Sequence, residues 1–389
     1  MRILIAVHTY YPEQNGVQTV TQYIAEGLAK KNNDVLVISE KKDNLLEKEN
    51  YNGVEIERIT VAKRGFSFVG DKRLFLNRIQ EFKPDIYIAV CMQSWPFDWT
   101  RQYLSSLKCK KVLYTHGCSA LFKTYPLGND LVNLKLRAFK YHFYWKKYYD
   151  KAYRYMQQYD LVTYLSTNNI SYWYAQKHGL KNGAVLCNAV DDIFFEKTKE
   201  KKRESTSKPL KYIYVANYDS NKNQKEVLKA FKNAELENAE LIFVGSKKNA
   251  YYDELEKDYN LFKKEIKGNV IFHVGLKRRE IPIKLLEADV FVCGSQKEEY
   301  PIMLCEAAVM KLPIITTKVG HASEIKGVCL VDNCEEMSEA MRRLYVDESE
   351  RIERGEQVYK YALRHYRISD KVEWMQTELE GLLKGEERK

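Results

Sequence analysis

The stretch GSQKEEYPIMLCEAAVMKLPIITTKVGHASEIK, from Gly294 to Lys326, is the most informative part of this chain. An apolar run, Val290–Cys293, precedes it and reads as a buried strand. After a polar loop, the pattern predicts a helix that begins near Pro301 and then a second apolar strand over Ile314–Thr317. A strand, a helix and another strand in this order are typical of a parallel α/β sheet.

Two acids, Glu298 and Glu306, lie on either side of the predicted helix start, the first on the loop and the second about two turns into the helix. A helix that begins at the carboxyl end of a strand presents unpaired N–H groups, which favour phosphate. Carboxylates beside it can accept hydrogen bonds from ribose or sugar hydroxyls. The stretch therefore predicts a sugar-nucleotide site, with an ordinary βαβ unit carrying surface acids as the alternative.

The spacing of these acids resembles the signature of the retaining glycosyltransferases of family 4 (glycosyl transferases group 1). In that family an acid, a Gly-Phe-Pro-like turn, a second acid, a Gly-Leu-Pro-like turn and an apolar strand follow one another. Tyr300-Pro301 matches the first turn, whereas Glu299 and Lys311 stand where glycines are usual. The resemblance implies the GT-B fold, in which two Rossmann-like doubly wound domains face an interdomain cleft.

The rest of the chain alternates strand and helix patterns twice, with a change of character near residue 188. We expect an N-terminal, acceptor-side Rossmann-like domain over residues 1–187 and a nucleotide-sugar-binding domain over 188–365. The last helix, about 366–389, is expected to pack back on the first domain. Open sheets of this kind usually bind ligands at the carboxyl ends of their strands.

Two motifs of the first half match the family. The loop after the first strand contains Asn15 and Gly16, which stand at the positions of a double-glycine loop that approaches the donor; only Gly16 is retained. His116 ends the strand Lys111–Tyr114, where the family has a histidine near the donor sugar. A plain strand-to-helix turn and an ordinary sheet-end histidine are the alternatives.

The second half begins with the segment Asn188–Asp191, which resembles the family's Asn-Gly-Val-Asp entry to the second domain. Further on, Lys222 matches a lysine that neutralises the donor diphosphate, and a solvated loop lysine is the alternative. Asn217 stands where the family has an arginine with the same task, so one expected cation is missing from the sequence.

Several other classes of protein are disfavoured. No apolar run approaches the roughly 18–20 residues of a membrane span, and the short apolar start reads as a buried strand rather than a signal peptide. The eight cysteines form no CxxC pair, which favours reduced thiols in a cytoplasmic protein. A dehydrogenase and a P-loop ATPase are disfavoured because neither GxGxxG nor a P-loop sequence is present. The absence of a DxD sequence favours a reaction without a metal, and no other cofactor is expected.

The chain has a net charge of +10, and its positive charge is concentrated in residues 101–154. This segment holds 12 basic and 2 acidic residues. Within it, a helix predicted over about 131–158 interleaves cations with aromatic residues. Such a helix can lie on an anionic membrane surface. An ordinary domain helix is the alternative, and no nucleic-acid-binding module accompanies the charge. The candidate membrane contacts are Lys140, Trp145, Lys146, Lys147 and Lys151.

The resemblance also implies roles for the matching residues. Glu306 is expected to accept the donor ribose hydroxyls and Glu298 the hydroxyls of the donor sugar, while Lys222 offsets charge on the leaving diphosphate. His116 would shape the sugar site. The backbone N–H groups of Ile302, Met303 and Leu304 would hold sugar and phosphate oxygens.

The sequence thus predicts a metal-independent, retaining hexosyltransferase, with a UDP-sugar as the favoured donor. The expected acceptor is a glycan or lipid-linked hydroxyl in bacterial cell-surface polysaccharide or glycolipid synthesis. The expected location is the cytoplasm, at the inner face of the cell membrane if the basic helix binds lipid. A soluble glycosyltransferase acting on a free sugar or a protein, and a non-catalytic GT-B binding protein, are the alternatives.

Overall fold

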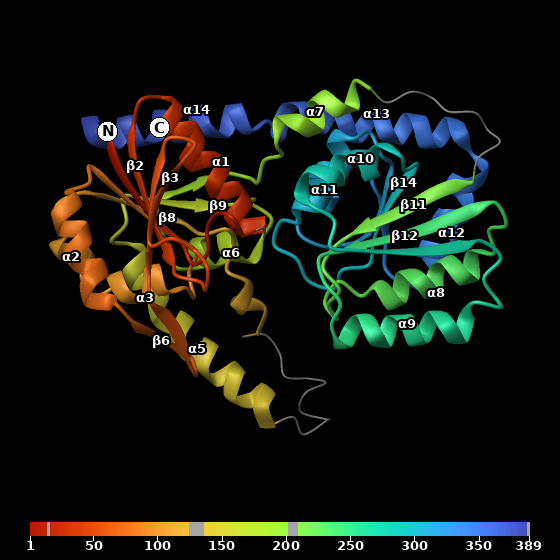
Figure 1. Cartoon of the computed structure of the whole chain (residues 1–389), viewed down its shortest axis with the longest axis horizontal. Helices are drawn as coiled ribbons and strands as arrows, with labels where there is room; N and C mark the ends of the chain where they lie inside the picture. The colour runs from red at the N-terminus through yellow and green to blue at the C-terminus, as the bar shows by residue number, and fades with distance from the viewer. Residues whose placement is uncertain (14–15, 124–135, 201–208, 387–389) are drawn as a thin grey trace. The chain divides into compact units, whose positions relative to one another are not determined.

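The structure is a computed structural model of the 389-residue chain. It describes residues 1–13, 16–123, 136–200 and 209–386. The chain divides into two compact units (Figure 1). The first consists of Met1–Cys187 and Ile368–Lys389, and the second of Asn188–Arg367. The eight cysteines all lie in described residues and are free thiols.

The first unit is built on a twisted sheet with the strand order β10-β9-β8-β7-β1-β2-β4-β3. All neighbouring strands are parallel except β3 and β4, which form an antiparallel edge. The strands are β1 (Arg2–Ala6), β2 (Asp34–Glu40), β3 (Lys48–Tyr51), β4 (Val54–Ile59), β7 (Ile86–Val90), β8 (Lys110–Tyr114), β9 (Leu161–Tyr164) and β10 (Gly183–Val185). The helices are α1 (Gly16–Lys30), α2 (Lys72–Phe82), α3 (Trp95–Thr100), α5 (Leu136–Met156) and α6 (Ile170–Lys177), with short 3-10 turns η1 (Leu104–Ser106) and η2 (Ser119–Lys123).

The chain winds outward from β1 in one direction and from β7 in the other, so the order of connection reverses between these two neighbours. At such a switch point the loops after the strands diverge and leave room for a ligand. The parallel order follows from the sequence: β7 is buried along its whole length, as the central strand of a two-sided sheet must be. The expected doubly wound architecture is confirmed for this unit.

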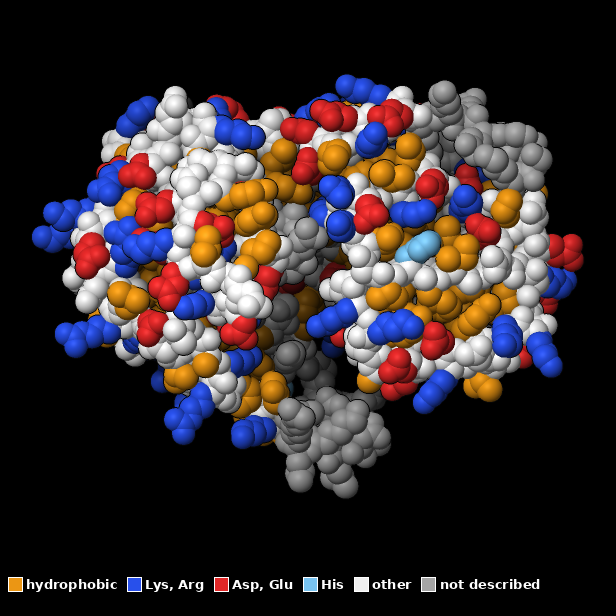
Figure 2. All heavy atoms as spheres, viewed as in Figure 1, with side chains coloured by type: hydrophobic (Ala, Val, Ile, Leu, Met, Phe, Trp, Pro, Cys, Tyr) orange, Lys and Arg blue, Asp and Glu red, His pale blue; other side chains and the backbone are white. Residues whose placement is uncertain are grey.

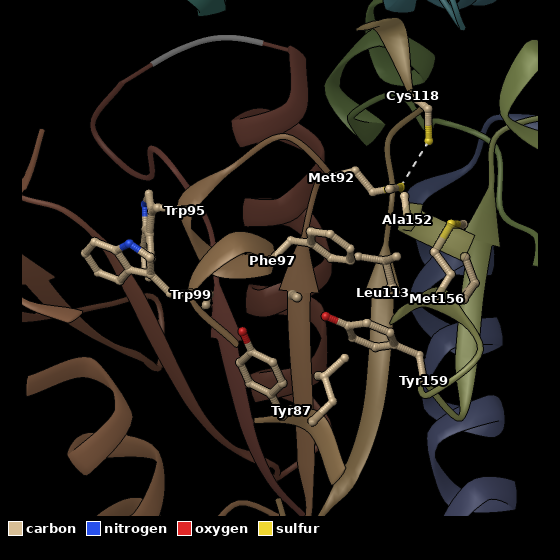
Figure 3. Close-up of a cluster of buried hydrophobic side chains, with 14 of the residues drawn as sticks. Tyr87, Met92, Trp95, Phe97, Trp99, Leu113, Cys118, Ala152, Met156 and Tyr159 are labelled. Atoms are coloured by element: carbon tan, nitrogen blue, oxygen red, sulfur yellow. Dashed lines mark hydrogen bonds between the residues drawn. The ribbon is translucent and has the colours of Figure 1, made fainter. Parts of the chain in front are cut away.

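One side of this sheet is covered by a core rich in aromatic residues (Figure 3). Phe97 of α3 stacks on Tyr159, with ring centroids 6.2 Å apart and an interplanar angle of 12°. From α5, Ala152 and Met156 reach the same core and are almost completely buried. The inner face of α5 therefore holds the helix to the sheet through apolar contacts.

A two-stranded hairpin, β5 (Val61–Arg64) and β6 (Ser67–Gly70), was not expected from the sequence. The ring of Phe66 at its tip stacks on Tyr144 of α5, with centroids 3.8 Å apart and an angle of 11°. The Tyr144 hydroxyl also donates to the Phe66 carbonyl at 3.2 Å. The hairpin thus packs against an aromatic side chain of α5, a contact that the sequence pattern alone does not predict.

The last helix, α14 (Ile368–Lys384), lies against α1 of the same unit. A Cβ at Gly27 would come within 2.3 Å of Val372 Cγ2, so glycine is what permits the close approach. The contact is completed by a hydrogen bond from Asn33 Nδ2 to Gln376 Oε1 at 2.8 Å and by the ion pair between Lys31 and Glu373.

The second unit contains a wholly parallel sheet with the order β13-β12-β11-β14-β15-β16. Its switch point lies between β11 and β14. The strands are β11 (Leu210–Val215), β12 (Ala239–Gly245), β13 (Asn269–Val274), β14 (Val290–Cys293), β15 (Ile314–Thr317) and β16 (Cys329–Val331). The helices are α7 (Asp192–Thr198), α8 (Gln224–Ala234), α9 (Ala250–Phe262), α10 (Ile281–Leu286), α11 (Ile302–Val309), α12 (Cys334–Val346) and α13 (Glu348–His365), with 3-10 turns η3 (Arg278–Glu280) and η4 (Ala322–Glu324).

Each unit is therefore a Rossmann-like α/β domain, and the fold class expected from the sequence is confirmed. None of the helices within the described ranges is long and apolar enough to cross a membrane.

Candidate active site

The loops at the switch point of the second sheet bring Lys222 and Glu298 together. Lys222 follows β11 and Glu298 follows β14, and these strands are neighbours although the residues are far apart in sequence. Lys222 Nζ lies 2.5 Å from Glu298 Oε1, and the two side chains are 22% and 15% exposed. A partly buried, hydrogen-bonded pair of this kind is worth more than a solvated surface pair. The two predicted site residues are thus directly in contact.

Hydrogen bonds join the two loops around this ion pair. The Tyr214 hydroxyl donates to the Lys222 carbonyl at 2.8 Å and lies 2.9 Å from Ser295 Oγ. Burial raises the pKa of Tyr214 well above its usual value, so the hydroxyl keeps its proton. Asn221 Nδ2 donates to the Lys297 carbonyl at 2.8 Å. The positions of Lys222 and Glu298 are consequently fixed by backbone contacts of both loops.

The Tyr300-Pro301 turn is held from three sides. Asn188 Nδ2 donates to the Tyr300 carbonyl at 3.0 Å, which gives the residue at the start of the second unit a structural task. The Tyr300 ring stacks on buried His321, with centroids 3.4 Å apart and an angle of 3°. Gly320 has a φ of +53°, and a Cβ there would lie 2.6 Å from Pro301 Cδ. Only glycine combines this backbone with such a close approach.

His321 itself is anchored by Tyr366, whose hydroxyl lies 2.8 Å from His321 Nε2. Burial lowers the pKa of His321 from 6.5 to about 3, so the imidazole is neutral at physiological pH. Its other polar neighbour is the thiol of Cys305, at 3.7 Å. This histidine therefore supports the turn and is not a free acid or base.

Glu306 lies in the second turn of α11, where it is almost completely buried. Its Oε1 accepts a hydrogen bond from Nη2 of Arg278, the first residue of η3. The guanidinium also lies 5.0 Å from the centroid of the Phe194 ring. A buried carboxylate needs such a partner, because an unpaired charge in this position is strongly destabilising.

The start of α11 presents the backbone groups that the sequence predicts to hold phosphate and sugar oxygens. Its first turn contains no acidic residue, and the positive end of a helix dipole favours negative charge. The Leu304 N–H donates to the Pro301 carbonyl at 3.1 Å, so that donor is already engaged within the turn. Ile302 and Met303 occupy the two positions before it.

Asn217 follows β11 and is exposed. Its carbonyl accepts a hydrogen bond of 2.9 Å from Gln224 Nε2, which fixes the backbone of the loop. An exposed amide at this position adds no positive charge. The loop that the sequence predicts to neutralise a diphosphate therefore presents Lys222 as its cation.

In the first unit, His116 follows β8 and adopts a left-handed backbone with a φ of +47°. Its ring packs against Tyr114 with centroids 3.9 Å apart, and its Nε2 lies 3.4 Å from Thr21 Oγ1 of α1. Thr21 donates its only hydroxyl proton to the Val17 carbonyl at 2.8 Å. The contact with Thr21 links His116 to α1.

Backbone outliers collect at this edge of the first sheet. Cys91 and Gln93, which follow β7, also have positive φ angles of 64° and 58°. Non-glycine residues in this conformation are costly and cluster at functional sites. Gly16 is the first residue of α1, whose first turn has no acidic side chain. Asn15 lies outside the described residues.

The membrane-contact candidates divide between two faces of α5. Lys140, Lys147 and Lys151 are exposed and share one helical face. Lys146 is exposed on a different face, where it pairs with Asp150 at 3.6 Å. Trp145 is turned inward, against the core and near Phe66, and so leaves the candidate set. The sequence predicts it as a membrane contact because cations and aromatic residues are interleaved along this helix.

The exposed aromatic residue of α5 is instead Phe143, which is 62% exposed and lies on the face of the three lysines. Arg154 continues this face and is exposed as well. Figure 2 shows basic and hydrophobic side chains side by side over this end of the first unit. We call the set Lys140, Phe143, Lys147, Lys151 and Arg154 the basic stripe.

Sequence reasoning missed Arg278, His321 and Tyr366. None belongs to a recognisable motif, and each acts through a contact with a residue far away in the chain. Arg278 begins a short turn in the loop after β13, at the edge of the sheet where ligands usually bind.

Comparison with known proteins agrees with this geometry. Residues 14–192 match the family described as Glycosyltransferase Family 4, and residues 195–364 match the family described as Glycosyl transferases group 1. Together the two matches account for nearly the whole chain. It therefore belongs to the group 1/family 4 glycosyltransferases, whose fold is GT-B.

Solved structures with a similar fold cover almost the full length. Sucrose-phosphate synthase from Thermosynechococcus elongatus has 13% identity and a TM-score of 0.77, with 99% of each chain covered. HepE from Anabaena, solved in complex with UDP-glucose, has 14% identity and a TM-score of 0.74, with 98% of this chain and 100% of HepE covered. WaaG, a glycosyltransferase involved in lipopolysaccharide biosynthesis, has 15% identity and a TM-score of 0.68, with 97% and 100% covered.

A curated relative from Klebsiella pneumoniae, an uncharacterised 41.2 kDa protein in the cps region, is 22% identical over 196 residues. The match covers 48% of this chain and 52% of the relative, so the chain spans about half the length of this relative.

Proposed function

We propose that the protein is a retaining hexosyltransferase that moves a sugar from a UDP-sugar to a hydroxyl acceptor in cell-surface polysaccharide or glycolipid synthesis. The observation that carries the proposal is the pairing of both signature acids with cations: Glu298 with Lys222 at the switch point of the second sheet, and Glu306 with Arg278. HepE, which has the same fold, was solved with UDP-glucose. The relative in a cps region and the role of WaaG in lipopolysaccharide biosynthesis support a cell-surface product.

In this proposal the second unit binds the donor. Glu306 accepts the ribose hydroxyls, and Glu298 accepts hydroxyls of the donor sugar. The N–H groups of Ile302 and Met303 at the start of α11 hold oxygens of the sugar and phosphates, where the helix dipole favours negative charge. A donor brings its own two phosphate charges, so Lys222 can serve the diphosphate while it remains beside Glu298.

Lys222 contributes most when the bond to the leaving group breaks. Negative charge then builds up on the diphosphate, and a fixed ammonium nearby stabilises that charge more than it stabilises the bound donor. Its interaction with Glu298 keeps the ammonium in place before the reaction, so little reorganisation is needed. This electrostatic contribution is the main catalytic effect that we assign to the second unit.

His116 and Gly16 of the first unit are proposed to serve the transferred sugar. In this proposal the His116 imidazole contacts a hydroxyl of the transferred sugar, and an imidazole can serve as a hydrogen-bond donor or acceptor. We propose a same-face substitution in which the departing phosphate takes the acceptor's proton, so that no side chain forms a covalent intermediate and no metal is needed.

The basic stripe on α5 is proposed to place the enzyme on an anionic membrane, close to a lipid-linked acceptor. Each exposed cation near such a surface contributes about 1 kcal/mol, and Phe143 can insert its ring at the headgroup level. This role belongs to an enzyme at the cytoplasmic face of the membrane.

The proposal is tested with a panel of UDP-, GDP- and ADP-sugars. Thermal-shift and calorimetric titrations identify the donor, and NMR of the product, or of the sugar released by slow hydrolysis, reports the anomeric configuration. We expect a UDP-sugar to bind and the configuration to be retained. Binding without any hydrolysis or transfer would instead favour a non-catalytic GT-B protein, for which the neutral Asn217 is the best structural argument.

A further inference from the structure

Arg278 is a cation that contacts a signature acid, Glu306, and the family signature does not include it. It reaches Glu306 from η3, a short turn after β13, whereas Glu306 belongs to α11 after β14. The two strands that precede these elements are not neighbours in the sheet, because β12 and β11 lie between β13 and β14. The contact therefore depends on the tertiary fold and on the exact placement of a turn.

The turn that carries Arg278 is itself well defined. Gly275, directly after β13, has a φ of +79°. The Glu280 carboxylate then accepts a hydrogen bond of 2.7 Å from the Lys277 N–H, which closes the turn around Arg278. The guanidinium packs over the ring of Phe194 at 5.0 Å, a favourable cation–π distance. Backbone, carboxylate and aromatic contacts together direct this arginine toward Glu306.

This arrangement has a consequence for ribose recognition. An ionised carboxylate offers only acceptors, with about four lone-pair positions, whereas a protonated one presents a donor and fewer acceptors. The Glu306 side chain is only 2% exposed and the Arg278 side chain 26% exposed. A buried carboxylate without a partner is costly, and a hydrogen-bonded cation offsets that cost. One guanidinium on Oε1 supplies that partner and still leaves acceptor positions for hydroxyl groups.

We propose that Arg278 is the positioning residue of the ribose site: it holds the Glu306 carboxylate in the orientation in which its oxygens can select a donor nucleotide by its ribose hydroxyls. This inference rests on the proposed function. It assigns Arg278 to the ribose through Glu306, and not to the diphosphate as a replacement for the arginine absent at Asn217. The two roles predict different binding patterns.

The test uses the full-length protein and calorimetric binding of UDP and of 2′,3′-dideoxy-UDP. The wild type should bind UDP about 10- to 100-fold more tightly, the range expected for hydrogen bonds to a charged group. Arg278→Gln and Glu306→Gln should both reduce this ratio to nearly 1 by weakening UDP binding, with little change for the dideoxy nucleotide. Arg278→Lys, which keeps the charge without the planar fork, should give an intermediate ratio.

Arg354→Gln is the matched control. Arg354 also pairs with a glutamate of the second unit, Glu350, at 2.7 Å, and its side chain has the same 26% exposure as that of Arg278. Its removal should leave the ratio at the wild-type value. If Arg278→Gln does not fold, Arg278→Lys carries the test alone, because an unchanged ratio in that variant would contradict the proposal.

Two further results would overturn the positioning role while leaving the proposed transfer from a UDP-sugar intact. In one, wild-type protein binds UDP and the dideoxy nucleotide equally. In the other, Arg278→Gln weakens both nucleotides by the same factor, as expected of a diphosphate cation. Failure of the wild type to bind any nucleotide or nucleotide sugar would overturn the proposed function and this inference together.

Discussion

Lys222 Nζ lies 2.5 Å from Glu298 Oε1, and this ion pair joins the loops after the two strands that flank the switch point of the second sheet. The backbone on both sides is fixed by Tyr214 and Asn221. A cation held in this way before the donor arrives is preorganised, which is the condition under which electrostatic catalysis is most effective.

Lys222→Gln should therefore reduce the rate of sugar transfer by about 10²- to 10³-fold, a typical effect of losing one group that stabilises developing charge. Steady-state kinetics with the donor found in the nucleotide-sugar panel measures this. The control is Lys225→Gln, which removes a lysine of the same unit that pairs with Glu254 at 2.9 Å on the surface of α8. Equal rates for wild type and Lys222→Gln would exclude the assigned role.

Glu298→Gln should reduce transfer as well, and for a different reason. The amide can still accept one hydrogen bond from a sugar hydroxyl, but it no longer holds the ammonium of Lys222 by charge. Because the two residues are in contact, their effects should not add. We expect the double variant Lys222→Gln/Glu298→Gln to be slowed by much less than the product of the two single effects, and independent effects would contradict a joint role.

His116→Asn should lower kcat for transfer by about 10²-fold with a smaller effect on the KM for the donor, since the proposed hydrogen bond acts on the sugar as it is transferred. Asparagine also tolerates the left-handed backbone at this position, so the loop is preserved. The matched control is His178→Asn in the same unit, where the imidazole stacks on Tyr153. Wild-type kcat in His116→Asn would remove this residue from the site.

The sequence predicts the two parallel sheets well because buried strands leave a strong local signal. Runs such as Ile86–Val90 are apolar on both faces, and only a sheet covered on both sides accommodates them. Glu298 and Glu306 could also be identified as candidate site residues, since their spacing is a local pattern. The partners of those acids depend on chain segments far apart: Arg278 reaches Glu306 from another strand, and no pattern of residues encodes this contact.

The surface helix shows a second limit. In α5 aromatic residues occupy the inner face and part of the outer face, so periodicity alone did not separate Trp145, which packs inward, from Phe143, which is exposed. The packing of Trp145 near the unexpected hairpin residue Phe66 decides its direction. A contact of this kind becomes visible only when the fold is known.

Stability of the second unit should fall below pH 6.5 because of His321. Its pKa is about 3 in the folded protein and near 6.5 when unfolded, so between these values the unfolded chain binds a proton that the folded one does not. Stability then rises with pH, by up to about 1.4 kcal/mol per unit for one such group. The side chains that contact His321 are Tyr300, Cys305 and Tyr366, residue types whose ordinary pKa values lie above this range.

Urea unfolding between pH 5 and 8 measures this effect. All five tryptophans belong to the first unit, so fluorescence follows that unit while circular dichroism follows both, and the difference isolates the second. The variant His321→Gln should show a flatter dependence between pH 5 and 6.5, even if it is less stable at every pH. An equally steep dependence in both proteins would assign the effect to other groups.

The basic stripe of α5 leads to the last prediction. Lys140, Lys147 and Lys151 share one exposed face with Phe143, so replacing the three lysines by glutamine should weaken binding to vesicles that contain an anionic lipid. At about 1 kcal/mol for each cation, the loss should reach about 10²-fold at low salt and shrink as salt is added. Vesicle flotation at two salt concentrations measures both effects.

The control for this experiment removes the same charge elsewhere: Lys247, Lys248 and Lys257 are exposed lysines of the second unit. Their replacement by glutamine should leave vesicle binding close to that of the wild type, because an attraction governed by net charge alone would fall equally in both variants. Phe143→Ser separates the remaining contribution, since a ring at the headgroup level adds an apolar contact that salt does not screen. If wild-type protein does not float with anionic vesicles at low salt, the stripe is an ordinary solvated helix face, and the acceptor must reach the enzyme in solution.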